Sequence, residues 1–333
     1  MVRATVTDVA RLAGVSPTTV SNVVTATVPV SPKTRERVER ALAELDYVPN
    51  LSARGLRNGR TGIVALALPD LSTAYAAEMA HHFVEVAGDR GRAIQIQETG
   101  NDSEREAQLL SRARVHLVDG LILNPVLLET SAVQPGVSLP PVVLIGEVDQ
   151  PIADHVWIDN VQACRDMLDL LITRGHRRIA VLGAMRSETS RLRIRGYREA
   201  LTEAGLPLDP DLEIDCLDWT ARGAAECLGG FREQEITFDA VFCLTDTIAL
   251  GALNALATAG LRVPEDVSVA GYDNVADSSF LVPPLTTVHF DKRQFAEQAV
   301  TLLQARIADR DRPIQSVVLP HSIMERASVR DRS

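Results

Sequence analysis

Between residues 61 and 290, short apolar runs alternate with longer segments of helical character, and this alternation constrains the fold more than any other feature. The apolar runs are GIVALAL, AIQIQE, DGLILN, PVVLIG, RRIAVLGA, DAVFCL and VSVAGY. Strands that alternate with helices predict parallel sheets covered by helices on both faces. The runs fall into two sets, divided near Asp159 and Asn160. The sequence therefore predicts two α/β sheets.

The first 60 residues instead carry the start and stop signals of short helices. Thr5 and Asp8 have the spacing of a capping box, and Gly14 can end that helix in the left-handed conformation. The pairs Ser16-Pro17 and Ser31-Pro32 each place a hydroxyl cap before a proline at the first helical position. Three short helices with a glycine-containing turn between the first two predict a helix-turn-helix.

Apolar residues at helical spacing indicate the inner faces of these helices. They are Val9, Leu12 and Ala13, then Val20, Val23 and Val24, then Val38, Leu42 and Leu45. The opposite face of the second helix presents Thr18, Thr19, Ser21, Asn22 and Thr25. Small hydrogen-bonding side chains of this kind suit base edges and phosphates. A solvated polar face on a helical bundle is the alternative.

Charge divides the chain near the same place. Residues 1–60 carry 9 Lys and Arg against 5 Asp and Glu, a net charge of +4, and the other 273 residues carry 25 against 39, a net charge of −14. This asymmetry fits a DNA-binding module joined to a domain that does not bind DNA. The stretch YVPNLSARGLRNGR, residues 47–60, offers Asn50 as a cap and about two turns of potential helix before a basic tail, which is less than the roughly 12–15 residues that sustain a helix in water. We expect it to fold only against another surface.

These features together resemble the lactose/galactose repressor (LacI/GalR) family. The resemblance runs through VTDVARLAGVSPTTVSNVV, VSPKTRERVERALAELDYVPNLSARGLRNGRT, LITRGHRRIAVLG, RLRIRGYREAL, TDTIALGALNALATAGLRVPEDVSVAGYDN and PPLTTV. It implies an N-terminal all-α helix-turn-helix headpiece and a two-lobed α/β effector domain like the periplasmic binding proteins. The implied divisions are a headpiece (1–49), a hinge helix (50–60), one lobe (61–160 with 291–319) and a second lobe (161–290 with 320–330).

The resemblance also implies roles in DNA binding. The second helix would enter the major groove, and the segment from Asn50 to Asn58 would fold as a hinge helix in the minor groove with Leu56 wedged into the central base step. The residues it assigns to DNA are Thr7, Ser16, Pro17, Thr18, Thr19, Ser21, Asn22, Thr25, Ser31, Thr34, Asn50, Ala53 and Leu56.

An effector site is expected where the strands end, because open α/β sheets bind ligands at the carboxyl ends of their strands. The candidates are Asp70, Tyr75, Asn124, Arg193, Trp219, Asp246, Asp273 and Phe290. An arginine and a carboxylate that converge on one cleft suit a polyol, and Trp219 could stack on the apolar face of a sugar ring. Asp246 could instead cap the next helix, and Trp219 could belong to ordinary packing.

Three positions depart from the family pattern and bear on the ligand. Gly146 stands where aspartate is frequent, Thr245 replaces a common asparagine, and Phe290 replaces a polar residue of the lactose repressor. We therefore do not expect that repressor's own galactosides to bind. A sugar or sugar derivative is the expected effector, with nucleosides and other small metabolites as the alternatives.

The remaining expectations concern the class of protein. The sequence contains no P-loop, GxSxG, HExxH or strand-following GxGxxG motif, so neither an enzyme nor a cofactor is expected. Cys164, Cys216, Cys227 and Cys243 are scattered, which indicates reduced thiols in a cytoplasmic protein rather than a metal site. The prediction is a repressor acting as a homodimer, since no C-terminal heptad repeat favours a tetramer. An activator of the same architecture and a solute-binding protein are the alternatives.

One prediction concerns operator sequence. Many family members carry arginine, which reads guanine, where this chain has Asn22, and asparagine is matched to adenine with a discrimination of roughly 1–3 kcal/mol per bidentate pair. We expect Asn22→Arg to change the preferred base at one position of each half-site from adenine to guanine. Selection of binding sequences from a random DNA pool measures this, and an unchanged preference would contradict the assigned contact.

Overall fold

The computed structural model describes residues 4–25, 28–47, 60–100, 102–115, 117–125, 133, 136, 139–146, 152–184, 187–216, 218–232 and 237–332. The chain divides into two compact units, residues 1–61 and residues 62–333. Within the described ranges, no helix combines the length and the apolar character needed to cross a membrane. The two units are best understood separately, because each has its own hydrophobic core.

The first unit is the predicted bundle of short helices: α1 (Val6–Ala13), α2 (Pro17–Thr25) and α3 (Pro32–Glu44). The capping box is present, with the Asp8 amide donating to Thr5 Oγ1 at 3.3 Å and the Thr5 amide donating to Asp8 Oδ2 at 3.0 Å. Gly14 ends α1 with φ of 62°, a left-handed conformation that glycine adopts without a Cβ clash. The three predicted helix starts are confirmed.

The core of this unit is made of small apolar side chains, and one sequence prediction about it is wrong. Val9, Ala10 and Ala13 of α1 pack with the valines of α2 and α3, whereas Leu12 is 46% exposed. At 100° per residue, Val9, Ala13 and Ala10 span one 100° arc of the helix, and Leu12 lies more than 100° from its centre. The i, i+3 relation between Val9 and Leu12 therefore does not put Leu12 on the buried face.

The second unit begins with a sheet in which all strands are parallel. Its described strands are β1 (Ile63–Leu68), β2 (Ala93–Glu98), β3 (Gly120–Leu123), β4 (Val142–Ile145), β5 (Asp154–Ile158) and β11 (Ser316–Leu319), in the order β11-β5-β4-β3-β1-β2. Helices α5 (Ala74–Asp89) and α11 (Lys292–Ala308) cover one face, and α6 (Ser103–Arg114) covers the other. Successive β1 side chains alternate between the two cores, which explains why IVALAL is apolar throughout.

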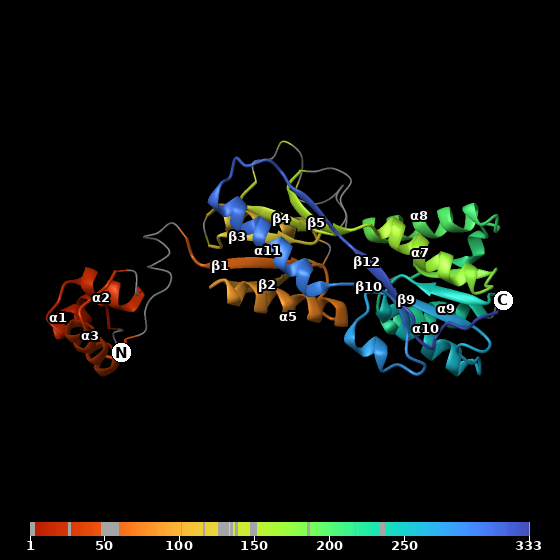
Figure 1. The fold of residues 1–333 in the computed structure, drawn as a ribbon, viewed down its shortest axis with the longest axis horizontal. Coiled ribbons are helices and arrows are strands. Elements are labelled where there is room, and N and C mark those ends of the chain that lie inside the picture. The colour runs from red at the N-terminus through yellow and green to blue at the C-terminus, as the bar shows by residue number, and fades with distance from the viewer. Residues whose placement is uncertain are drawn as a thin grey trace. The chain divides into compact units, whose positions relative to one another are not determined.

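The second sheet repeats this plan. Its described strands are β6 (Ile179–Ala184), β7 (Glu213–Asp215), β8 (Ala240–Cys243), β9 (Ser268–Tyr272), β10 (Thr286–Phe290) and the antiparallel β12 (His321–Met324), in the order β12-β10-β9-β8-β6-β7. Helices α7 (Asn160–Thr173) and α8 (Glu188–Glu203) lie on one face, with α9 (Ala221–Arg232) and α10 (Asp246–Thr258) on the other (Figure 1). Two 3₁₀ turns, Pro210–Leu212 and Ala276–Ser279, lie in the connections.

Three passages of the chain join the two sheets. It leaves the first sheet after β5 to form α7, returns after β10 to form α11, and passes from β11 to β12 at Pro320. Both sheets have the same strand order, with the first strand placed between the second and the third. In such sheets the connections diverge beside the first strand and leave a crevice at its carboxyl end. We call the first sheet with α5, α6 and α11 the first half of the unit, and the second sheet with α7, α8, α9 and α10 the second half. The fold thus supplies two crevices, one in each half.

Close packing of α7 against α8 requires a residue without a side chain at position 196. A Cβ atom on Gly196 would lie 2.4 Å from the Val161 carbonyl oxygen and 2.9 Å from Cys164 Cβ. We expect Gly196→Ala to lower the free energy of unfolding of this unit by about 1–3 kcal/mol, as overpacking does. Both tryptophans, Trp157 and Trp219, lie in this unit, so tryptophan fluorescence during urea unfolding reports the change.

The matched control is Gly229→Ala in α9, where a Cβ atom would have no atom within 4 Å. Removing a glycine from a helix interior should there be neutral or stabilising by about 0.5–1 kcal/mol. Equal losses in the two variants would mean that the α7–α8 contact is not the cause.

Candidate functional site

A cavity of about 300 Å³ lies where the carboxyl ends of the two sheets face each other. From the first half it is lined by Leu68, Pro69, Asp70, Thr73, Tyr75, Ala76, Asn124, Pro125, Gly146, Ile158 and Phe295. From the second half and the connecting strands it is lined by Asn160, Ser187, Thr189, Arg193, Asp218, Trp219, Thr245, Thr247, Asp273 and Phe290. Several of these residues follow a strand directly, among them Pro69, Asn124, Gly146 and Asp273, as the crevice rule predicts.

Seven of the eight effector residues predicted from the sequence line this cavity. They are Asp70, Tyr75, Asn124, Arg193, Trp219, Asp273 and Phe290. The sequence reasoning missed the hydroxyl residues Thr73 and Ser187 and considered Thr245 only as a departure from the family pattern. These three residues cap α5, α8 and α10. A Ser or Thr between an apolar strand and a helix is a readable signal for such positions, because a helix that follows a parallel strand starts at the same edge as the ligand crevice.

Arg193 is the most constrained residue of the cavity. Its side chain extends from α8 and the residue is 7% exposed, with Nε donating to Asn160 Oδ1 at 2.9 Å and Nη1 donating to the Leu244 carbonyl. The guanidinium carbon lies 3.4 Å from the ring centroid of Tyr272. Cation–π contact and hydrogen bonds together compensate for burying the charge. The orientation of the guanidinium is therefore fixed by the protein.

Asp273 lies opposite this cation, with Oδ1 at 3.7 Å from Arg193 Nη2. It is 4% exposed, and its backbone has φ of 108° directly after β9. Burial raises the pKa of the Asp273 carboxyl to about 6, against the opposing attraction of Arg193 and Lys292. The cavity floor thus holds one donor group and one acceptor group within reach of a single ligand.

Asp246 does not line the cavity, which corrects its predicted place in the site. Nor does it cap α10, since Thr245 accepts the hydrogen bond from the Ile248 amide at 3.1 Å. The Asp246 carboxylate instead accepts hydrogen bonds from the Thr287 hydroxyl at 2.6 Å and the Val275 amide at 2.9 Å. Burial, followed by the charge of Asp273, raises its pKa to about 7. Asp246 therefore supports the loop that carries Asp273.

The cavity has an aromatic wall. The rings of Tyr75 and Phe290 lie 6.3 Å apart, and those of Phe290 and Phe295 lie 5.8 Å apart. Trp219 packs partly against the core and also lines the cavity. Its indole Nε1 donates to the Gly183 carbonyl at 2.8 Å, beside the register shift between Leu182 and Ala184 in β6. The ring is therefore held in place.

The departure at Gly146 has a structural basis. Gly146 has φ of 95°, and a Cβ atom there would lie 3.3 Å from Asn124 Oδ1 in the cavity wall. An aspartate at this position would need a strained backbone and would crowd Asn124. The first half of the cavity consequently presents the Asn124 side chain beside Gly146.

The polar face predicted for α2 is accessible. Ser16, Pro17 and Thr18 are exposed, and Asn22 is half-buried. The Ser16 and Thr19 hydroxyls lie 2.9 Å apart, and the Ser31 hydroxyl donates to Thr34 at 2.9 Å. The side chain of Thr25 and the residues Asn50, Ala53 and Leu56 lie outside the described part of the chain. Thr7, Ser21 and the other predicted contact residues lie on the three described helices or their caps.

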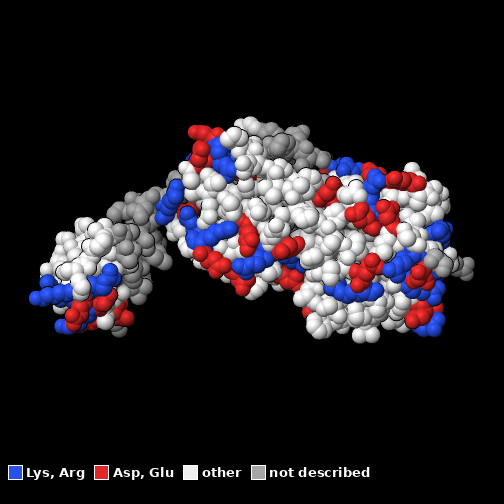
Figure 2. Space-filling model, viewed as in Figure 1, with Lys and Arg blue, Asp and Glu red and all other residues white. Residues whose placement is uncertain are grey.

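Among the described residues, one group has metal-ligand chemistry: His81, His82 and Glu85 on α5. It lies outside the cavity lining, and the Arg293 guanidinium is 3.3 Å from Glu85. That positive charge opposes a second cation at the same carboxylate. Elsewhere on the face of the second unit in Figure 2, acidic and basic side chains are interspersed.

Comparison with known proteins identifies the family to which this architecture belongs. A model of the bacterial regulatory proteins of the lacI family matches residues 5–50, and a model of the periplasmic binding protein-like domain matches residues 168–329. The HTH-type transcriptional repressor PurR of Pasteurella multocida is 32% identical over 333 residues, which are 99% of both chains. The chain belongs to the LacI family. This confirms the family and the fold that the sequence motifs indicated.

Solved structures of transcriptional regulators extend the comparison. The lac repressor dimer bound to operator and the anti-inducer ONPF superposes with a TM-score of 0.85 at 28% identity, over 99% of this chain and all of the other. The complex of the transcriptional regulator CelR with cellobiose gives a TM-score of 0.71 at 32% identity, over 98% of this chain and all of the other. The named relatives are transcriptional regulators rather than enzymes.

The buried carboxyls predict an unusual pH dependence for this LacI-family protein. An acid whose folded pKa is raised binds a proton that the unfolded chain releases, so stability falls as the pH rises from about 4 toward 7. At about 1.4 kcal/mol per pKa unit, we expect Asp246 to account for about 2–3 kcal/mol of the loss in unfolding free energy between pH 5 and pH 7.5. Asp246→Asn should flatten that slope in urea unfolding followed by tryptophan fluorescence.

The control for this measurement is Asp277→Asn, which alters an exposed carboxyl in the loop that Asp246 supports. It should leave the pH slope as in the wild type. If Asp246→Asn also retained the wild-type slope, the titration would have to be assigned to other groups.

Proposed function

We propose that the chain is a repressor that binds a pseudo-palindromic operator as a homodimer and that a small ligand in the cavity controls its affinity for DNA. The observation that carries this proposal is the facing pair Arg193 and Asp273 in an aromatic-walled cavity between two similar halves. Such a pair binds rather than reacts, and a ligand that touches both halves fixes the angle between them. A headpiece (1–49), a hinge (50–60) and two lobes (61–160 with 291–319, and 161–290 with 320–330) are the functional divisions we propose.

The accessible polar face of α2 supports major-groove binding. Pro17, Thr18 and Asn22 would face bases, and Ser16, Ser21 and Thr34 would face phosphates. The other proposed contacts are Thr7, Thr19, Thr25 and Ser31. The hinge residues Asn50, Ala53 and Leu56 would fold into the minor groove, with Leu56 inserted at a central base step.

The chemistry of the cavity favours a sugar or sugar derivative. Arg193 donates and Asp273 accepts, so adjacent hydroxyl groups of one ring can bond to both. The hydroxyls of Thr73, Ser187 and Thr245 add groups of either kind, and Trp219 offers an aromatic face for the C–H side of the ring. Similarity to CelR, described as a cellobiose complex, agrees with this class. A nucleoside is the second candidate, because Tyr75, Phe290 and Trp219 could also stack on a base.

Control would act through the hinge. A ligand that alters the angle between the halves would move the two hinge segments of a dimer relative to each other. A short helix is only marginally stable, so a coupling free energy of about 1–3 kcal/mol would change operator affinity by roughly 5- to 150-fold. The same architecture serves for control by an inducer or by a corepressor. The protein would act as an activator if its DNA site lay differently relative to that of RNA polymerase.

The deciding experiment combines DNA footprinting with a ligand panel. The purified full chain is titrated onto DNA from upstream of its own gene, at low salt where phosphate contacts are strongest, with and without a panel of sugars and nucleosides. Protection of a palindrome with a flexible central step supports the repressor proposal, and the compound that changes protection identifies the ligand class. Absence of any protected site, here and in selection from genomic fragments, would contradict DNA recognition by the headpiece.

Arg193→Ala tests the ligand site separately from DNA binding. In a Trp157→Phe background, Trp219 is the single tryptophan, so its fluorescence reports a ligand that enters the cavity. We expect Arg193→Ala to lose the response to the active compound by at least 100-fold in concentration, while operator binding without ligand is retained, because charged hydrogen bonds are strong when buried. Arg195→Ala alters an exposed arginine of the same helix and should respond normally. A normal response in Arg193→Ala would exclude this residue from the ligand site.

A further inference from the structure

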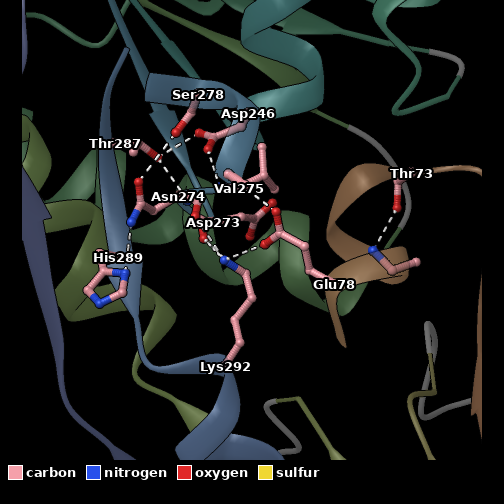
Figure 3. Close-up of polar contacts among 12 residues, drawn as sticks. Thr73, Glu78, Asp246, Asp273, Asn274, Val275, Ser278, Thr287, His289 and Lys292 are labelled. Atoms are coloured by element: carbon pink, nitrogen blue, oxygen red, sulfur yellow. Dashed lines mark hydrogen bonds and ion pairs between the residues drawn. The ribbon is translucent and has the colours of Figure 1, made fainter. Parts of the chain in front are cut away.

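Lys292 is a buried cation that sits where the two halves of the second unit meet. It is the first residue of α11, directly after the chain returns from β10 to the first half, and it is 7% exposed. Its Nζ donates to the carbonyl oxygens of Asp273 at 2.6 Å and Asn274 at 2.9 Å and pairs with Glu78 Oε2 at 3.1 Å (Figure 3). These three contacts match the three N–H donors of an ammonium group.

Glu78 continues this contact across the boundary. It lies on α5, which packs on the first sheet together with α11, and its other oxygen accepts a hydrogen bond from the Ala276 amide at 2.5 Å. Residues 273–276 follow β9 of the second sheet. One carboxylate and one ammonium from the first half therefore bind three backbone groups in the second half: the carbonyls of Asp273 and Asn274, and the amide of Ala276, which lies 198 residues from Glu78 in sequence.

The backbone held in this way is the segment that carries Asp273, whose carboxylate is proposed to bind the ligand. Asp273 and Asn274 have φ of 108° and 45°, in the left-handed region that costs a non-glycine residue energy. From the second half, Asp246 binds the Val275 amide, Arg326 donates to Asn274 Oδ1 at 2.6 Å, and His289 lies 3.0 Å from Asn274 Nδ2. Lys292 and Glu78 supply the corresponding contacts from the first half. The placement of the Asp273 carboxylate thus depends on the angle between the halves.

We propose that Glu78 and Lys292 form a latch that stabilises this angle between the halves and positions Asp273 in the cavity. As the regulation of the proposed ligand site, it rests on the proposed function. A rotation about the three connecting passages would separate Glu78 from Ala276 and leave the Lys292 charge with fewer protein partners. Truncating one member of a buried, hydrogen-bonded ion pair is costly for the member that remains. Glu78 and Lys292 are positioning residues, because they act on the ligand through Asp273.

The test measures the angle directly, without ligand or DNA. Spin labels are placed on exposed positions of the two halves, by Ser111→Cys in α6 and Asn254→Cys in α10, in a Cys227→Ser background that removes the one described thiol that is not buried. Pulsed electron–electron double resonance on the full chain then gives the distribution of distances between the labels on α6 and α10. We expect Glu78→Gln and Lys292→Met to shift the mean of this distribution or at least to double its width. The reference is the labelled protein that retains Glu78 and Lys292.

The matched control is Glu85→Gln, which makes the same charge change on the same helix. Glu85 pairs at 3.3 Å with Arg293 of α11 and lies 3.6 and 3.9 Å from His81 and His82 of α5, so all of these partners belong to the first half. It should leave the distance distribution unchanged. A local second measurement is hydrogen exchange of the Ala276 amide, which should become at least tenfold faster in Glu78→Ala and remain as in the wild type in Glu85→Gln.

The outcomes separate the latch from the proposed function. The latch proposal is overturned if the distance distribution is unchanged in Glu78→Gln and the exchange rate of the Ala276 amide is unchanged in Glu78→Ala. This holds even when sugars and operator bind as proposed. An equal shift in Glu85→Gln overturns it too, because any loss of charge on α5 would then suffice. If Lys292→Met does not fold, the Glu78 variants decide. Altered distances in a protein that binds none of the tested ligands support the latch and contradict only the ligand class.

Discussion

The second unit depends on charged side chains that are buried although its hydrophobic cores do not require them. Arg193, Asp273, Asp246 and Lys292 are all nearly inaccessible to solvent, although placing such groups in a protein interior costs several kcal/mol each without partners. Three of them have fixed dipoles as partners: backbone carbonyls for Lys292, an amide and a hydroxyl for Asp246, and an aromatic face and a carbonyl for Arg193. Asp273 faces the Arg193 guanidinium.

Much of this arrangement is readable in the sequence because it depends on local rules. Capping residues locate the helix starts of the first unit, and apolar runs locate the strands whose carboxyl ends form the cavity. Leu12 and Asp246 mark the limit of such rules. The exposure of Leu12 depends on the direction from which two neighbouring helices approach an eight-residue helix. The partners of Asp246, Thr287 and Val275, are 41 and 29 residues away, so its position after a strand could not distinguish a ligand contact from support of a loop.

The contacts of Lys292 and Glu78 are invisible to sequence reasoning for a different reason. Each lies on a helix that otherwise packs in the ordinary way against the first sheet, and a single charged residue at a helix start or on a helix face is usually solvated. Only the return of the chain from β10 brings α11 beside the loop after β9. Non-local topology, rather than residue type, makes Glu78 a partner of backbone 198 residues away and Lys292 a partner of backbone 18 and 19 residues away.

Buried ion pairs suit a molecule that must change between two arrangements. A hydrophobic contact loses free energy gradually as surfaces separate, whereas a buried, hydrogen-bonded ion pair loses most of its stabilisation within a small displacement and leaves uncompensated charges. The net stability that such a pair adds is small, because desolvation offsets attraction, so an alternative arrangement in which water reaches the charges lies close in free energy. A ligand that bonds to Arg193 and Asp273 acts on the same set of charges. A modest difference in its affinity for the two arrangements is then sufficient to choose between them.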